Sequence, residues 1–166
     1  MTPGPVPPRF SDADRAWMRE ALALAARAAA LGEVPVGALV VRAGDVLGRG
    51  FNAPIGERDP TAHAEIVAIR AACQALGDFT LRGCQVYTSC EPCPMCLAGL
   101  WWARVDTIFY ANTRSDAAAI GFDDKNIYQE LARAPAERKL PLRQLMRDRA
   151  MRAFSAWRSK ADRVEY

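Results

Sequence analysis

Residues 59–65 read Asp-Pro-Thr-Ala-His-Ala-Glu, and residues 92–96 read Pro-Cys-Pro-Met-Cys. Each stretch carries a signal that starts a helix. Thr61 can cap a helix over residues 62–76, and a proline at the first helical position can open another that ends near Trp102. The two stretches are therefore predicted to form the beginnings of two consecutive helices.

Alternating helix and strand patterns surround these two helix starts. Ser11 and Asp14 have the spacing of a capping box ahead of an amphipathic stretch that ends at Gly32. We predict helices at 12–31, 62–76, 92 or 94 to 102, 125–132 and 151–160, with strands at 34–41, 46–51, 85–88 and 105–110. Residues 140–146 fit either a strand or a helix start. This order predicts a layered α/β domain with a mixed sheet, whose first hairpin is antiparallel and whose helix-joined strands are parallel.

Length and composition indicate one globular domain. The chain has 166 residues, of which 51% are apolar and 25% charged. Four prolines among the first eight residues predict a flexible lead-in over 1–10, which leaves a single domain over 11–166. We find no apolar run of the roughly 20 residues that a membrane helix needs, and no apolar core of a signal peptide. The net charge of +3 is too small to indicate a nucleic-acid partner by itself.

The cysteines indicate a metal site in a reducing compartment. The chain has five, and three of them (Cys90, Cys93 and Cys96) fall within seven residues. An odd number crowded in this way is typical of metal binding and not of a secreted disulfide framework. We therefore expect a cytoplasmic protein without a membrane partner.

One histidine and two cysteines form the candidate zinc site. A catalytic Zn²⁺ takes three protein ligands and leaves a fourth position open, and His63, Cys93 and Cys96 supply such a set. Glu65 is two residues from His63, and in the first turn of a helix both side chains can flank one point. The pattern His-x-Glu followed by Pro-Cys-x-x-Cys is the signature of zinc deaminases, in which the glutamate carries protons and does not bind the metal.

A closed structural site is the alternative interpretation. Cys90 would complete a Cys₃His set with the same three residues, as in a zinc-stabilised binding module. Two points weigh against it: Cys90 precedes Pro92 and is expected to point away from the helix, and Glu65 would have no task.

With these residues in place, the chain resembles the cytidine deaminase superfamily and, within it, the bacterial guanine deaminases. The motifs at 59–65 and 87–96 are shared with related families. More specific are short matches in the second half, at 116–118, 121–124, 127–128, 156–158 and 165–166. The resemblance implies a cytidine deaminase-like, three-layer α/β/α sandwich and zinc-dependent hydrolytic deamination of a purine base, guanine becoming xanthine with release of ammonia.

The resemblance also implies further site residues and a partner. Besides the zinc ligands and the proton carrier Glu65, it makes Asp124 a second catalytic polar group at the amino-bearing edge of the purine. It implies that the substrate is contacted by Asn52, Ala64, Trp102 and Tyr166. Family members are dimers that exchange their C-terminal segments, so a homodimer is expected here and nucleic acid is not.

One stretch departs from the guanine deaminase pattern. Residues 34–38 read Val-Pro-Val-Gly-Ala, which is similar to the tRNA adenosine deaminases, and Val36 stands where the guanine deaminases have Phe. A smaller side chain there leaves room for guanosine or for an aminotriazine such as ammeline. Residues 138–152 carry six basic side chains and one acid, most simply a solvated helical face, and they keep adenosine in tRNA open as a substrate.

Overall fold

The computed structural model describes residues 10–122 and 124–165. The chain divides between Lys125 and Asn126 into two compact units. The predicted flexible lead-in lies outside the described residues apart from Phe10, and the single domain predicted over 11–166 stays a prediction. Among the residues that the structure describes, no helix combines the length and the apolar character needed to cross a membrane.

The first unit is built on a mixed four-stranded sheet. Its strands are β1 (Gly37–Arg42), β2 (Asp45–Phe51), β3 (Gln85–Cys90) and β4 (Thr107–Asn112), in the spatial order β2-β1-β3-β4. Strand β1 runs antiparallel to β2 and β3, whereas β3 and β4 are parallel. This confirms the predicted mixed sheet, the antiparallel hairpin and the parallel pair joined through a helix.

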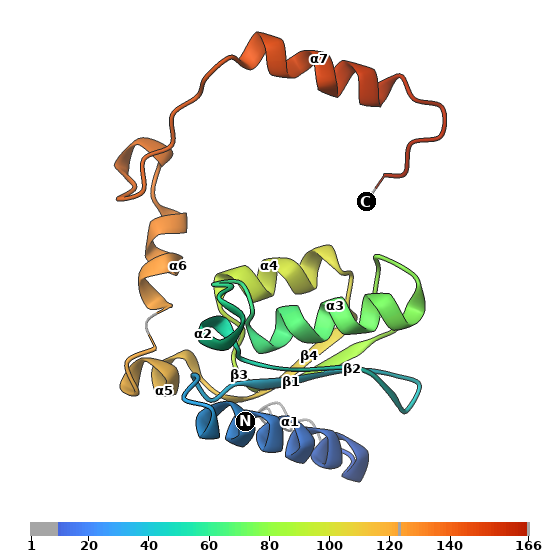
Figure 1. The fold of residues 1–166 in the computed structure, drawn as a ribbon, viewed down its shortest axis with the longest axis vertical. Helices are drawn as coiled ribbons and strands as arrows, with labels where there is room; N and C mark the ends of the chain where they lie inside the picture. The colour runs from blue at the N-terminus through green and yellow to red at the C-terminus, as the bar shows by residue number, and fades with distance from the viewer. Residues whose placement is uncertain (1–9, 123, 166) are drawn as a thin grey trace, which may run out of the picture. The chain divides into compact units, whose positions relative to one another are not determined.

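Helices cover both faces of this sheet (Figure 1). Helix α1 (Asp12–Ala30) lies on one face, and α3 (Ala64–Leu76) and α4 (Pro94–Trp102) lie on the other. A short α2 (Pro54–Glu57) precedes α3, and α5 (Arg114–Ala119) follows β4. The first unit is therefore the α/β/α sandwich that the resemblance implied.

Helix α3 approaches the strand backbone unusually closely. A Cβ atom added at Gly50 would lie 2.1 Å from the carbonyl oxygen of Ala64, and one at Gly48 would lie 2.3 Å from that of Ala68. The helix presents the small, fully buried side chains of Ala64, Ala68 and Ala72 to this surface. Glycines opposite alanines therefore let α3 rest directly on β2, which fixes the position of its first turn.

Helix α1 is anchored at its start and along its buried stripe. Ser11 and Asp14 form the predicted capping box. The Tyr87 hydroxyl, from the central strand β3, donates a 2.5 Å hydrogen bond to Oδ1 of Asp14. Trp17 lies against the Tyr87 ring at 5.3 Å between centroids, and the Phe109 ring of β4 stacks on Tyr87 at 4.7 Å. An aromatic cluster thus joins α1 to the sheet.

One predicted helix start is wrong, and a second is decided between its two alternatives. The N-cap of α3 is His63 and not Thr61, because Oδ1 of Asp59 accepts hydrogen bonds from both the backbone amide and the hydroxyl of Thr61. That turn holds Thr61 outside the helix. For α4, Cys93 is the N-cap and Pro94 opens the helix, which decides between the two prolines left open above.

Two predicted boundaries on the way to the site also differ. Strand β1 begins at Gly37, because Val34 to Val36 form a tight turn in which the Val36 amide donates to the Val34 carbonyl at 2.8 Å. Between the predicted strand at 46–51 and the predicted helix at 62–76, where no helix is predicted, the structure has the short helix α2, which begins at Pro54.

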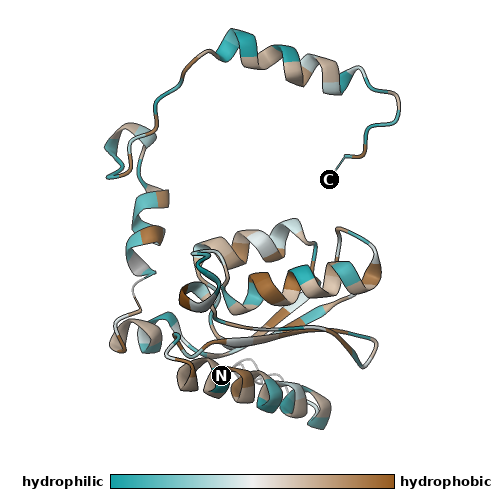
Figure 2. Ribbon diagram, in the orientation of Figure 1, coloured by the Kyte–Doolittle hydropathy of each residue, from teal (hydrophilic) through white to brown (hydrophobic). Residues whose placement is uncertain are grey.

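The second unit is helical and has no core of its own. It holds most of α6 (Lys125–Ala132), a 3₁₀ turn (Pro135–Glu137) and α7 (Arg147–Arg158). Residues 140–146 form neither a strand nor a helix, and Met146 is the N-cap of α7. No residue of 126–165 is buried, although apolar side chains recur along this segment (Figure 2). They include Ile127, Leu131, Leu140, Leu142, Leu145, Met151, Phe154 and Trp157.

Candidate metal centre and active site

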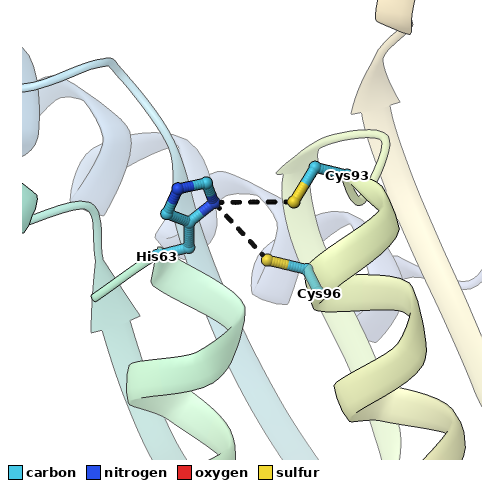
Figure 3. Close-up of side chains that lie close together, drawn as sticks. All are labelled: His63, Cys93 and Cys96. Atoms are coloured by element: carbon cyan, nitrogen blue, oxygen red, sulfur yellow. Dashed lines mark hydrogen bonds between the residues drawn. The ribbon is translucent and has the colours of Figure 1, made fainter. Parts of the chain in front are cut away.

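Two neighbouring helix starts bring three metal-binding side chains together. His63 is the N-cap of α3, Cys93 is the N-cap of α4, and Cys96 follows in the first turn of α4. The imidazole Nδ1 lies 3.6 Å from each of the two Sγ atoms (Figure 3). All three ligand atoms lie within 4.8 Å of one another.

This spacing fits a tetrahedral zinc ion. With Zn–S near 2.3 Å and Zn–N near 2.0–2.1 Å, tetrahedral angles place a nitrogen and a sulfur about 3.6 Å apart, which is the spacing observed. Cys90 is not part of the cluster among the described residues; it is buried at the end of β3. The pKa of its thiol is raised to about 11, chiefly by burial. The closed Cys₃His arrangement is therefore not the one that this chain forms.

The cluster already favours a thiolate before a metal binds. Hydrogen bonding from the Cys96 thiol, assisted by His63, lowers the pKa of Cys93 to about 4 against the opposing effect of burial. The hydrogen bond between the His63 ring and the Cys93 sulfur raises the pKa of His63. Donating to Cys93 raises the pKa of Cys96 in turn, so metal binding has to displace the Cys96 proton.

Glu65 stands beside the cluster without belonging to it. It lies in the first turn of α3, two residues after the histidine, and only 3% of its surface is exposed. Its Oε1 accepts a 3.1 Å hydrogen bond from the hydroxyl of Thr88 on β3. Burial is the main cause that raises the pKa of this carboxyl. A buried carboxyl with a raised pKa next to a metal site has the properties of a group that gains and loses a proton.

A recess opens at the cluster, and Asn52 is held rigidly in its wall. The recess is lined by Val36, Asn52, His63, Glu65, Cys90, Glu91, Cys93 and Phe122. Asn52 follows β2 and is 1% exposed, and its Oδ1 accepts a 2.8 Å hydrogen bond from the backbone amide of Ala64. Because this bond engages the carboxamide oxygen, the NH₂ group is what Asn52 can offer to a ligand. Ala64 itself is fully buried.

Asp124 is a buried acid with an unsatisfied oxygen. It is 4% exposed, and among the described residues its Oδ1 is the buried side-chain polar atom without a hydrogen-bond partner. Burial, reinforced by the Cys93 thiolate, raises the pKa of Asp124. A buried acceptor without a donor is costly, so such a group in a native fold calls for an explanation, such as a ligand donor.

The remaining predicted contacts are not gathered at the recess. Trp102 lies at the end of α4 with 57% of its surface exposed and the Arg104 guanidinium 5.8 Å from its ring centroid. It is not among the residues that line the recess. Tyr166 lies outside the described residues.

Two residues near the cluster had no role in the sequence interpretation. Phe122 lines the recess, with its ring centroid 5.8 Å from that of His63. Thr88 donates to Glu65 from β3. The sequence does carry a signal for Thr88. Strand periodicity puts Thr88 on the same face as Cys90, and Cys90 lies two residues before the motif that begins at Pro92.

Comparison with known proteins agrees with this geometry. Residues 11–112 match the family described as the cytidine and deoxycytidylate deaminase zinc-binding region. The chain belongs to the cytidine and deoxycytidylate deaminase family. It is a zinc-dependent deaminase, and the cluster of His63, Cys93 and Cys96 is its zinc site.

Individual members of the family match to different extents. The guanine deaminase of Bacillus subtilis is 46% identical over 132 residues, which cover 80% of this chain and 85% of that protein. A crystal structure of guanine deaminase from Bacillus subtilis is 41% identical and covers 95% of this chain and 99% of its own, with a TM-score of 0.89. The tRNA-specific adenosine deaminase of Haemophilus influenzae is 39% identical over 120 residues, 69% of each chain.

Proposed function

We propose that the protein deaminates guanine, using one water molecule to give xanthine and ammonia. The choice of substrate rests on how much of the chain is similar to guanine deaminase. The structural match covers 95% of the chain and thus extends into the second unit. The likeness to the tRNA-specific adenosine deaminase spans 69%. Asp124, whose buried Oδ1 lacks a hydrogen-bond partner, lies beyond the family match that ends at residue 112 and supports the same choice.

Glu65 carries the protons in the proposed mechanism. Zinc held by His63, Cys93 and Cys96 would supply a water whose pKa is lowered to near 7. Glu65 takes a proton from that water and gives it to a ring nitrogen beside the amino-bearing carbon, which makes the carbon electrophilic. A C–O bond forms at this carbon. A carboxylate then takes the remaining proton of the attacking oxygen and passes it to the amine, after which the C–N bond breaks and ammonia leaves.

Asn52, in the recess wall, and the buried Asp124 orient the purine in this proposal. Asn52 donates from its NH₂ group to an acceptor of the purine, because its oxygen is occupied by Ala64. Asp124 accepts an N–H from the amino-bearing edge, which supplies the donor that its buried Oδ1 lacks. The resemblance adds Trp102 and Tyr166 as residues that close over the substrate.

A substrate panel tests the function. We expect ammonia release from guanine to exceed that from guanosine, ammeline, adenine and cytosine. Val36→Phe is the matched variant, because Val36 lines the recess and the guanine deaminases resembled have Phe there. It should preserve guanine turnover and suppress any turnover of the larger guanosine. Faster release from cytosine, or from tRNA, than from guanine would contradict the proposal.

We also propose a homodimer that exchanges the segment after Lys125. Residues 126–165 bury no side chain within their own unit, although their helices carry Phe154, Trp157 and several leucines. The first unit in turn has an apolar groove of about 780 Å³ between α1 and β4, and β4 is an edge strand. A second copy offers such a segment a surface to cover.

The five free thiols, two of which bind zinc, support a reducing compartment such as the cytoplasm.

Deamination of adenosine in tRNA is the second candidate. It is favoured by Val36, by the likeness to the Haemophilus influenzae enzyme, and by a basic stretch in the second unit. That stretch contains Arg138, Lys139, Arg143, Arg147, Arg149 and Arg152, with Asp148 as its acid. Binding through phosphates weakens steeply with salt. Salt-insensitive guanine turnover without measurable tRNA binding would eliminate this candidate.

A further inference from the structure

Thr88 is a polar side chain in the middle of an apolar core. It lies on the central strand β3, where its register partners are Ala38 of β1 and Tyr110 of β4. It is fully buried on the same face as Val86 and Cys90. A hydroxyl at such a position is costly unless it is hydrogen-bonded, and this one donates to Oε1 of Glu65 at 3.1 Å.

This hydrogen bond constrains the acid that the mechanism uses. A glutamate side chain has several rotatable bonds, and helix α3 fixes only its backbone. Thr88 holds Oε1, and the Cys96 thiol and the backbone amide of Glu65 itself also hydrogen-bond the carboxyl, so the carboxyl cannot rotate freely. Threonine suits the task because its branched Cβ restricts its own rotamers, and the central strand fixes its backbone.

We propose that Thr88 is a positioning residue that holds Glu65 in the orientation needed for proton transfer. The proposal rests on the proposed role of Glu65 as the proton carrier. The hydroxyl of Thr88 donates to Glu65 and not to a zinc ligand, Asn52 or Asp124, so its effect should fall on kcat and not on KM.

The neighbouring residue offers a matched control. Ser89 is also buried on β3 and also makes a hydrogen bond through its hydroxyl, accepting from the Gly37 amide at 3.0 Å. Its side chain points to the opposite face of the sheet. A loss of stability common to both positions can therefore be separated from an effect on Glu65.

The experiment compares Thr88→Val, Thr88→Ser and Ser89→Ala in the zinc-loaded, full-length protein. Steady-state kinetics with guanine, zinc content and the midpoint of urea unfolding are measured for each. Valine preserves the shape and removes the hydroxyl, so kcat should fall by roughly 10- to 100-fold with KM within about twofold and zinc retained. Thr88→Ser keeps the donor and should stay within about threefold of the wild-type kcat. Ser89→Ala should lose stability while retaining kcat.

Three outcomes would overturn the positioning role. One is a wild-type kcat in Thr88→Val, and another is an equal loss of kcat in Ser89→Ala. The third is a Thr88→Ser variant as slow as Thr88→Val. If valine prevents folding, Thr88→Ala removes the same hydroxyl without adding bulk and takes its place. Glu65→Gln is assayed alongside: if it is inactive while Thr88→Val is fully active, only the positioning role fails. If Glu65→Gln is itself active, the proposed function fails first.

Discussion

The two units of this chain use their apolar residues in opposite ways. In the first unit, apolar side chains fill both sides of a sheet, and Leu39, Tyr87 and Leu100 are fully buried. In the second, α7 carries Phe154 and Trp157, yet nothing within the unit buries them. Exposed apolar area of this kind marks an interaction surface. The comparison teaches that the zinc ligands and Glu65 all lie in the first unit, whereas the second leaves its apolar side chains unburied, as the proposed exchange requires.

The largest expected effect tests whether the chemistry resides in the first unit. Glu65→Gln removes a proton carrier and keeps the size of the side chain, so kcat should fall by roughly 10²- to 10⁴-fold. Zinc content should stay at the wild-type level, because Glu65 is not a ligand. Glu20→Gln, which removes an acid that pairs with Arg49 at the surface, is the control and should leave kcat unchanged. Normal turnover by zinc-loaded Glu65→Gln would remove Glu65 from the mechanism.

The second prediction concerns the apolar face of α7. Replacing Phe154 and Trp157 together by serine should dissociate the proposed dimer at micromolar concentration, since burial of an aromatic side chain contributes about 3–5 kcal/mol. The measurement is molar mass by light scattering over a dilution series. Arg149→Ser, on the same helix, should leave the mass unchanged. A double variant that stays dimeric, or a wild-type protein that is monomeric, would contradict the exchange.

Much of the zinc site could be predicted because its signals are local. His63, Cys93 and Cys96 each lie at a helix start that proline, threonine or spacing marks in the sequence, and the structure brings all three together. The capping box at Ser11 was equally visible. The prediction of Thr61 as the N-cap is wrong because the side chain of Asp59 accepts hydrogen bonds from the amide and the hydroxyl of Thr61. Spacing alone does not show this contact.

What could not be predicted depends on contacts between distant residues. Thr88 meets Glu65 across 23 positions, and Glu33 caps a helix 22 positions away, so neither pair leaves a periodic signal. The division at Lys125 was not expected, because the amphipathic pattern of α6 does not tell whether a helix packs on its own core or on another surface.

The third prediction concerns the segment after β2, which carries Asn52 and is held by Glu33. The carboxylate of Glu33 is buried and accepts from the amides of Ile55 at 3.1 Å and Gly56 at 2.8 Å, just beyond Asn52. Glu33→Ala leaves both amides unpaired and should lower the free energy of unfolding by about 1–3 kcal/mol. Because this loop carries Asn52, KM should rise as well. Glu33→Gln keeps an acceptor and should recover most of the loss. Unchanged urea midpoints in both variants would show that the cap is dispensable.

The smallest effect comes from the acid that anchors α1. The hydroxyl of Tyr87, with further bonds from Ser11, lowers the pKa of Asp14 below its ordinary value. A lowered folded-state pKa contributes stability that is present above the unfolded-state value near 3.9 and is lost as the pH falls through the folded one. Asp14→Ala should therefore cost about 0.5–2 kcal/mol at pH 7, and the difference from wild type should shrink below about pH 4. Thermal unfolding across pH checks this, with Asp12→Ala as control. A difference that grows on acidification would contradict the assignment.

X-ray absorption at the zinc edge of the loaded full-length protein tests the central claim most directly. Three protein ligands predict two sulfur scatterers and two lighter ones, nitrogen or oxygen, with the same spectrum in Cys90→Ala. The Cys90→Ala variant should also release ammonia from guanine at the wild-type rate. Three sulfur scatterers in the wild type, with one lost in Cys90→Ala, would show a closed site and contradict hydrolytic catalysis at this zinc.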